Sequence, residues 1–344
     1  MVNKPEGVAR AITEEPIDPE LPICDPHHHL WDWPTRRDFP GSRYLLEELL
    51  QDIGDGHNIV KTVFVQCGSM YRAEGAEEMR PVGETEFVQG VAARSASGQY
   101  GTTRVAAGIV SHADLTLGAA VATVLEAHIA ASGNRFRGIR HMTAWDATPA
   151  IASFAGTPTL LLDSRFREGF ACLRKYGLSF DAWLYHPQLT QLVDLARAFP
   201  DTVIILNHIG GPLGIGPYAE SREEEYQQWR NGIAELSTCP NVVVKLGGLG
   251  MPAAGLGLNE RTPPPDSAEL AKVMKPYYHF CIEQFGANRC MFESNFPVDK
   301  VSYPYTVMWN AFKRISKDFS REDRAALFHG TAVRVYRLTT DHEG

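Results

Sequence analysis

Three consecutive histidines near the start of the chain are the clearest sign of chemistry in the sequence. They belong to the segment Leu21-Pro22-Ile23-Cys24-Asp25-Pro26-His27-His28-His29-Leu30-Trp31-Asp32, in which a short apolar run ends in an acid. Side chains alternate between the two faces of an extended strand, so His27 and His29 point one way and His28 the other. Two imidazoles on one face can share a metal ion or polarise one substrate oxygen. The alternative is that all three are structural and bonded to backbone and water.

Polar residues also follow most of the later β-branched segments. They are Gln66, Arg140, His141, Tyr185, His186, Asn207, His208, Glu293, Asn295 and Asp299. An arginine such as Arg140 can grip a substrate carboxylate through two parallel hydrogen bonds. Structural alternatives exist, because Arg140 and His141 can form ion pairs within the fold and Lys245 can pair with Glu293. The remaining histidines are interpreted as structural or surface residues: His57, His112, His128, His279, His329 and His342.

The hydrophobic pattern alternates between strands and helices along the whole chain. After a first strand that ends at the histidines, strands are predicted at 59–67, 104–110, 136–141, 178–184, 202–207, 242–246 and 289–292. Helices are predicted at 44–50, 86–96, 117–131, 165–176, 189–199, 221–236 and 268–285, with two more at the end. Eight such units favour a closed (β/α)₈ barrel, and the first strand lacks the G-x-G-x-x-G of a dinucleotide-binding sheet. We expect one barrel domain at 21–338, an N-terminal arm at 1–20 and a tail at 339–344.

Composition restricts the partners. The 344 residues are 44% hydrophobic and 22% charged, with a formal net charge of −8 and no run of Lys and Arg, which argues against nucleic acid and anionic membranes. The sequence has neither the apolar stretch of a signal peptide nor an uncharged 18-residue span. The six cysteines are scattered along the chain without a Cys-x-x-Cys pair, so we expect reduced thiols in the core rather than disulfides or zinc sites. We expect a cytoplasmic enzyme with a small-molecule substrate; the Gly- and Pro-rich loop at 247–266 is a candidate lid or homo-oligomer contact.

The chain resembles the amidohydrolase superfamily, in its amidohydrolase-2 branch of lactonase-like enzymes. The resemblance rests first on Asp25-Pro26-His27-His28-His29-Leu30-Trp31-Asp32. It continues through Phe136-Arg137-Gly138-Ile139-Arg140-His141, His186-Pro187-Gln188-Leu189, Asn207-His208-Ile209-Gly210-Gly211-Pro212 and Lys245-Leu246-Gly247-Gly248, in the order of that branch's later motifs. It covers residues 21 to 338 and implies a TIM-type barrel. Related enzymes hydrolyse sugar lactones and pyrone dicarboxylate, and more distant ones decarboxylate aromatic acids.

The resemblance also implies roles for the histidines. His27 and His29 match the H-x-H pair that binds zinc or, in metal-free relatives, the substrate carbonyl. His208 matches a histidine that helps to polarise that carbonyl, and His186 stands where many members have a further metal ligand. The implied cofactor is one divalent ion held by His27, His29 and His186, with zinc ahead of manganese, although a metal-free site is also consistent with the resemblance. Asp25 is expected to orient the histidines rather than to act as a base.

The last motif departs from the family pattern. The family has Phe-Gly-Ser-Asp followed by an aromatic residue and Pro, whereas this chain has Phe292-Glu293-Ser294-Asn295-Phe296-Pro297-Val298-Asp299. Asn295 occupies the position of the Asp that takes a proton from the attacking water, and an amide cannot accept that proton. Glu293, on the same strand face, is the preferred replacement and Asp299 the second. In the third interpretation, water activation is lost.

The sequence therefore predicts a hydrolase that opens a small lactone bearing a carboxylate. The expected catalytic residues are His27, His29, His208, Glu293 and Asp299. The expected substrate-binding residues are Arg140, His141, Tyr185 and Asn295. Two alternatives remain open: a lyase that decarboxylates or hydrates an aromatic or unsaturated acid, and a ligand-binding protein on a degenerate barrel.

Overall fold

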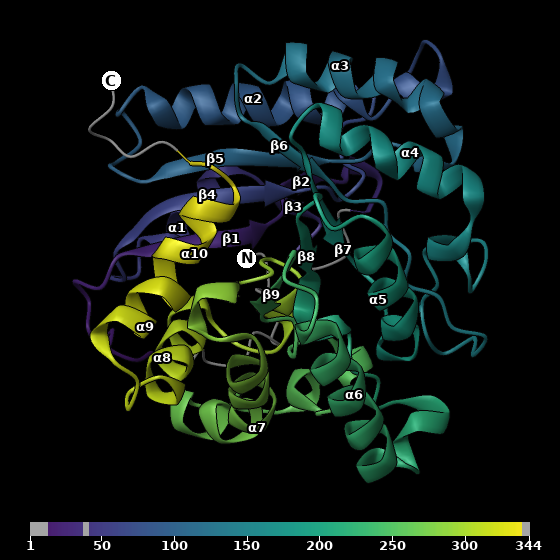
Figure 1. Cartoon of the computed structure of the whole chain (residues 1–344). Helices are drawn as coiled ribbons and strands as arrows, with labels where there is room; N and C mark the ends of the chain where they lie inside the picture. The colour runs from purple at the N-terminus through teal and green to yellow at the C-terminus, as the bar shows by residue number, and fades with distance from the viewer. Residues whose placement is uncertain (1–12, 37–40, 339–344) are drawn as a thin grey trace.

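Eight parallel strands form the centre of the molecule. The computed structural model describes residues 13–36 and 41–338, so the predicted tail at 339–344 and residues 1–12 of the predicted arm lie outside the described residues. The strands pair in the order β1 (Ile23–His28), β4 (Ile59–Val65), β5 (Arg104–Ser111), β6 (Phe136–Ile139), β7 (Ser179–Ala182), β8 (Ile204–Leu206), β9 (Val242–Leu246) and β10 (Cys290–Phe292). A bridge between His28 and Phe296 brings the β10 side of the sheet back to β1. The predicted (β/α)₈ barrel is confirmed (Figure 1).

Each of these strands is followed by a helix, because two parallel neighbours need a crossover connection. The helices are α1 (Leu46–Ile53), α2 (Val82–Ala96), α3 (Val121–Ala131), α4 (Ser164–Lys175), α5 (Leu189–Ala198), α6 (Arg222–Ser237), α7 (Ser267–Phe285) and α8 (Tyr305–Ile315). Two short helices, α9 (Arg321–Ala325) and α10 (Thr331–Val335), finish the described chain. None of the helices in the described ranges is both long and apolar enough to span a bilayer.

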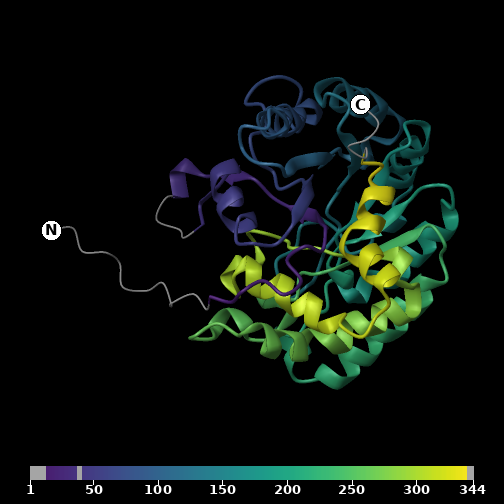
Figure 2. The ribbon, with the colours of Figure 1, turned by 90° about the vertical axis from the view of Figure 1, so that its left-hand side faces the viewer.

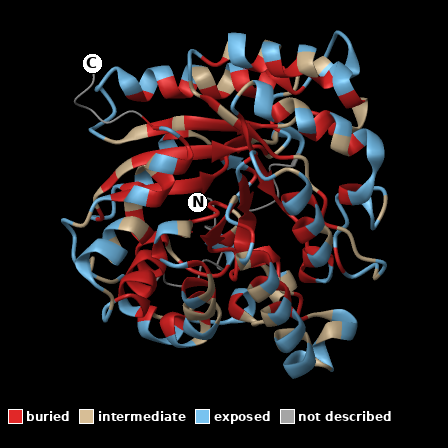
Figure 3. Ribbon diagram, in the orientation of Figure 1, coloured by how far each residue is buried: buried red, intermediate tan, exposed pale blue. Residues whose placement is uncertain are grey.

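The strands are buried on both faces, which explains their almost continuous apolar sequences. All five residues of β9 are buried, including Lys245. Figure 3 shows the buried residues concentrated in the strands and along the inner sides of the helices. At the N-terminal end of the barrel, Tyr336 and Leu338 from the end of the chain pack in one apolar cluster with Cys24 and Met291. Apolar side chains thus fill the N-terminal end of the barrel, and the polar side chains described below lie at the C-terminal ends of the strands.

The structure differs from the prediction mainly at the ends of elements. β6 stops at Ile139 and β8 at Leu206, so the polar residues that follow them lie in loops. A two-stranded ribbon of β2 (Trp31–Asp32) and β3 (Arg43–Tyr44) was not predicted, because each strand has only two residues. The described chain, up to Leu338, finishes with three α-helices rather than two, since a π-helical turn at Ala326–Gly330 separates α9 from α10.

The described part of the predicted arm packs on the barrel's outer helices. The carboxylate of Glu14 accepts hydrogen bonds from the backbone of Ser267 at 2.7 Å and from Asn310 Nδ2 at 2.9 Å. The buried ammonium of Lys313 donates to the carbonyls of Ile17 and Asp18, at 2.7 and 2.8 Å. Figure 2 shows this purple segment running beside the yellow-green C-terminal helices.

Candidate active site

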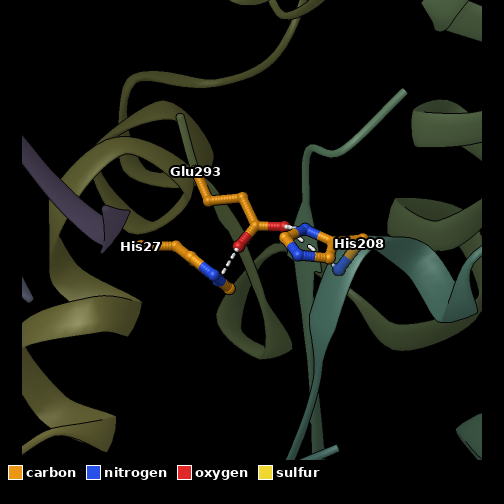
Figure 4. Close-up of side chains that lie close together, drawn as sticks. All are labelled: His27, His208 and Glu293. Carbon is orange, nitrogen blue, oxygen red and sulfur yellow. Dashed lines mark hydrogen bonds and ion pairs between the residues drawn. The ribbon is translucent and has the colours of Figure 1, made fainter. Parts of the chain in front are cut away.

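A buried carboxylate lies between two histidines at the C-terminal end of the barrel. Glu293 Oε1 accepts hydrogen bonds from Nδ1 of His208 at 2.6 Å and from the backbone N–H of His208 at 3.0 Å. Glu293 Oε2 lies 2.7 Å from Nδ1 of His27 (Figure 4). His27 and Glu293 are fully buried and His208 is 3% exposed. Of the two predicted acids, it is therefore Glu293 that meets the histidines.

Local backbone geometry explains how these three side chains converge. His208 follows β8 with a φ of +53°, in the left-handed region that few non-glycine residues adopt. Gly247 and Gly248 follow β9 and leave the necessary space. A Cβ on Gly247 would lie 2.3 Å from Cγ of Glu293, and one on Gly248 would lie 2.5 Å from Cβ of His208. The glycines of the Lys-Leu-Gly-Gly motif thus make room for the carboxylate and its histidine.

Two cations lie against the ring of His27. Arg140 Nη1 lies 3.3 Å from Nε2 of His27, and Lys245 Nζ lies 3.2 Å from its Nδ1. Arginine and lysine only donate, so both ring nitrogens of His27 face donors, while Nδ1 also lies near Oε2 of Glu293. Burial, and next the charge of Lys245, holds the pKa of His27 well below its usual value. His27 is therefore neutral near pH 7 and lies between these two cations and the carboxylate of Glu293.

Arg140 and Lys245 are held by further polar groups inside the barrel. Arg140 donates from Nε to the side chain of Gln66 at 3.1 Å and from Nη2 to the Gln66 carbonyl. Lys245 Nζ donates to Oδ1 of Asp181 at 2.8 Å, and the hydroxyl of Tyr336 donates to the same oxygen at 2.8 Å. Lys245 thus bonds Asp181, whereas the alternative raised by the sequence was a pair with Glu293.

The other two histidines of the triplet behave as strand alternation predicts. His29 donates from Nδ1 to the carbonyl of Val65 at 2.8 Å, and its ring lies 4.9 Å from that of His27. His28 instead contacts Oγ1 of Thr62 through Nε2 at 2.9 Å. His27 and His29 therefore share the site, and His28 belongs to the wall between β1 and β4. The Nδ1 contact of His29 leaves its Nε2 available to a ligand.

Asp25, Asn295 and Asp299 form hydrogen bonds around the site with backbone groups and with one another. Asp25 accepts hydrogen bonds from the backbone N–H groups of His27 and Ser294, at 3.3 and 3.0 Å, and so ties the end of β1 to the end of β10. Asp299 accepts from Asn295 Nδ2 at 2.8 Å and from the Tyr303 hydroxyl at 2.7 Å. Burial raises the pKa of both acids to about 6. The structure places Asp299 against Asn295 rather than in the His27–Glu293–His208 group.

Two residues of the predicted site lie elsewhere. Nε2 of His186 lies 2.9 Å from Glu225, and its Nδ1 accepts from the backbone of Leu213 at 3.2 Å. Both ring nitrogens are thus engaged outside the central group, because the 3₁₀ turn at His186–Gln188 carries the ring toward α6. The hydroxyl of Tyr185 donates to the carbonyl of Ala152 at 2.7 Å and so anchors the insertion at 142–162.

A cavity of about 890 Å³ opens above the ends of β4, β5 and β6, and its lining reaches the central group through Gln66 and Arg140. Its lining includes Gln66, which binds Arg140, and Arg140 in turn reaches His27. His112 and His141 line it as well. His112 was expected to be structural, although it lies two residues after the strand predicted at 104–110, and this position near a strand end was the signal that could have identified it.

The central group is also suited to a metal ion. One ligand atom from each of His27, His208 and Glu293 lies within 4.8 Å of the others, and all three residues are buried. Two imidazoles and one carboxylate form a donor set typical of catalytic zinc. The predicted set of His27, His29 and His186 shares only His27 with this group.

The sequence of the chain is similar to a known family and to individual proteins along most of its length. The family model described as Amidohydrolase matches residues 24–338. An uncharacterised protein, y4mH, from Sinorhizobium fredii is 34% identical over 336 residues, covering 93% of this chain and 99% of that protein. An L-fucono-1,5-lactonase from Burkholderia ambifaria is 25% identical over 319 residues, covering 91% of this chain and 95% of that enzyme.

Solved structures with the same fold are also found. An amidohydrolase from Burkholderia multivorans, crystallised with bound zinc, has a TM-score of 0.69 at 23% identity, covering 92% of this chain and 99% of the other. The strand-end histidines, the buried glutamate and the family match over almost the whole chain lead to the same conclusion. The chain belongs to the amidohydrolase family.

Proposed function

We propose that this protein hydrolyses a small lactone, with His208 as the general base and Glu293 as the residue that positions it. The observation that carries the proposal is the hydrogen bond from Nδ1 of His208 to Glu293 Oε1 at 2.6 Å. An ionised carboxylate only accepts, so the proton of a neutral His208 lies on Nδ1 and its Nε2 has a free lone pair. A carboxylate in this place also stabilises the imidazolium that forms when Nε2 takes a proton.

The remaining residues supply the other parts of a hydrolysis. His208 Nε2 takes a proton from water, whose oxygen attacks the lactone carbonyl, and the imidazolium then gives the proton to the ring oxygen as the acyl C–O bond breaks. Arg140 uses three of the five N–H groups of a guanidinium in its contacts with Gln66 and His27. Its remaining donors and its charge can stabilise the oxyanion. The product is a hydroxy acid.

A divalent metal fits the same residues. His27, His208 and Glu293 would hold it, and zinc is favoured by the donor set and by the zinc in the Burkholderia multivorans relative. When bound, the ion would polarise the carbonyl and lower the pKa of a coordinated water. Because Nδ1 of His208 carries a proton toward Glu293, metal binding through that nitrogen would displace the proton. The named lactonase relatives support the choice of reaction.

The test is a panel of five- and six-membered lactones followed by proton release, run beside a panel of aromatic and unsaturated acids followed by CO₂ release. The matched variant is His208→Asn, because Asn keeps a donor near the Nδ1 position and tolerates positive φ, but lacks Nε2. The proposal predicts lactone opening by the wild type and a loss of about 100-fold or more in the variant. Release of CO₂ without lactone opening would favour the lyase alternative, and binding without any product would favour a ligand-binding protein.

A further inference from the structure

Two histidines from neighbouring strands face the cavity together. His112 directly follows β5 and His141 lies two residues beyond β6. Both line the cavity of about 890 Å³, and their ring centroids are 5.0 Å apart with the planes at 72°. Nothing in the proposed hydrolysis requires them. The pair therefore needs an explanation of its own.

Hydrogen bonds to the backbone make Nε2 of one ring an acceptor and Nε2 of the other a donor. Nδ1 of His112 lies 3.3 Å from the carbonyl oxygen of Arg140, which only accepts, so Nδ1 carries the proton and Nε2 is an acceptor. Nδ1 of His141 accepts from the backbone N–H of Leu115 at 3.2 Å, so the proton lies on Nε2. Burial lowers the pKa of His141 to about 4 and that of His112 below its usual value. Both rings are therefore neutral near pH 7.

The surroundings hold this arrangement in place. His128 donates from Nε2 to the carbonyl of His112 at 2.9 Å, and Oγ1 of Thr85 contacts His128 Nδ1 at 2.7 Å. The ring of His141 packs 5.4 Å from that of Phe166, a fully buried side chain. A pair supported in this way keeps its acceptor and its donor in fixed positions, as recognition sites require.

We propose that His112 and His141 bind a hydroxyl group of the substrate. The hydroxyl donates its proton to Nε2 of His112, and its oxygen accepts from Nε2–H of His141. A carboxylate only accepts, so it would meet the lone pair of His112 with no proton between them. The pair thus selects a hydroxyl over a carboxylate at this position of the ring. This inference rests on the proposed function for the identity of the ring, a lactone.

The charge of the cavity supports the same selection. Its lining includes three carboxylates and one guanidinium, namely Glu77, Glu78, Asp114 and Arg80. A cavity with an excess of negative charge disfavours an anionic ligand. Arg140, expected from the sequence to grip a substrate carboxylate, gives three of its five N–H groups to Gln66 and His27, and the proposed hydrolysis uses the other two for the oxyanion. The substrate that this cavity fits is therefore an uncharged, hydroxyl-bearing lactone rather than the carboxylate-bearing one expected from the sequence.

The experiment uses variants that remove the Nε2 side of each ring and keep a group at the position of Nδ1. In His112→Asn, the side-chain amide retains a donor to the Arg140 carbonyl, and in His141→Asn, the amide oxygen retains an acceptor for Leu115 N–H. Both variants lack the Nε2 atom. The probes are anhydrohexitols, which are cyclic ethers with ring hydroxyls and no carbonyl, and tetrahydropyran carboxylate. Binding of each probe to the full chain is measured by ligand-observed NMR, with circular dichroism as the control for folding.

We expect the wild type to bind the anhydrohexitol more tightly than the carboxylate, and each variant to lose about tenfold of the anhydrohexitol affinity. His112→Asn should bind the carboxylate at least as well as the wild type does. Tighter binding of the carboxylate by the wild type, or unchanged anhydrohexitol binding in both folded variants, would overturn the inference. Because the probes cannot be hydrolysed, this result is independent of whether any lactone is opened. With a lactone that is turned over, both variants should raise KM and leave kcat nearly unchanged, unlike His208→Asn.

Discussion

Glu293 and His208 are joined twice, since a single carboxylate oxygen accepts both the ring Nδ1–H and the backbone N–H of the histidine. The backbone bond holds the carboxylate against the turn after β8, and the ring bond sets which nitrogen carries the proton. The two hydrogen bonds depend on each other, because the positive φ of His208 directs its backbone N–H and its side chain to the same oxygen. The backbone conformation at His208 therefore sets the orientation of the proposed base.

The glycines after β9 should be intolerant of substitution. Gly247→Ala would place a Cβ 2.3 Å from Glu293 Cγ, so Glu293 must move away from His208. We expect a loss of stability of about 1–3 kcal/mol and a larger loss of turnover. Gly90→Ala in α2 is the matched control, because its Cβ has no neighbour within 4 Å and alanine favours a helix. Denaturant unfolding of both variants checks this, and equal stability and activity in the two would contradict it.

Removing only one charged side chain of the Lys245–Asp181 ion pair should strongly lower the free energy of unfolding. Both side chains are fully buried, and Lys245→Met would leave Asp181 charged among Asn207 and Tyr336. We expect a loss of about 3–5 kcal/mol, much of it recovered in the double variant with Asp181→Asn. Urea unfolding of the single and double variants measures the coupling. The exposed pair Arg174–Asp201 is the control and should contribute little. Additive effects at the buried pair would refute this interpretation.

Stability should decrease as the pH falls from about 6.5 toward 4. Burial lowers the pKa of several histidines to about 4, so the unfolded chain takes up protons in this interval before the folded chain does. These histidines are His28, His57, His128 and His141. Burial also raises the pKa of three acids, which opposes the trend: Asp25 and Asp299 to about 6 and Glu84 to about 7. The histidines outnumber the acids, and the pKa values of His27 and His29 are lowered as well.

The variant His57→Gln isolates one of these groups. It should reduce the slope of unfolding free energy against pH by about 1.4 kcal/mol per pH unit between pH 5 and 6. Denaturant unfolding of the wild type and the variant at several pH values gives both slopes. A wild-type stability that rises as the pH falls through this interval would contradict the assignment of buried neutral histidines.

Metal content distinguishes the observed group from the ligand set expected from the sequence. We expect about one zinc per chain in protein purified without tags or chelators, measured by inductively coupled plasma mass spectrometry. His27→Ala should remove the metal, whereas His186→Asn should retain it, because His186 lies against Glu225 and Leu213. Loss of zinc from the His186 variant alone would show that the metal lies elsewhere.

The sequence predicted the barrel and much of the site because strand order places the C-terminal ends of successive strands at one rim. That rule correctly brought His27, His208 and Glu293 together. It could not place His186, since a 3₁₀ turn after the strand redirects the ring toward α6. Nor could it identify the Lys245–Asp181 pair, because these residues are 64 positions apart and either could have met another partner. Such pairings depend on side-chain packing inside the barrel, which no local pattern encodes.

The central claim is that Glu293 positions His208 for hydrolysis, and its most direct test is the ring-opening rate of Glu293→Gln. With the best lactone from the panel, we expect kcat/KM to fall about 100-fold or more, because a neutral amide cannot stabilise the imidazolium of His208 as a carboxylate does. Asp299→Asn is the control and should stay within about tenfold of the wild type, since Asp299 bonds Asn295 and Tyr303 instead. A Glu293→Gln variant that is folded and as active as the wild type would contradict the account.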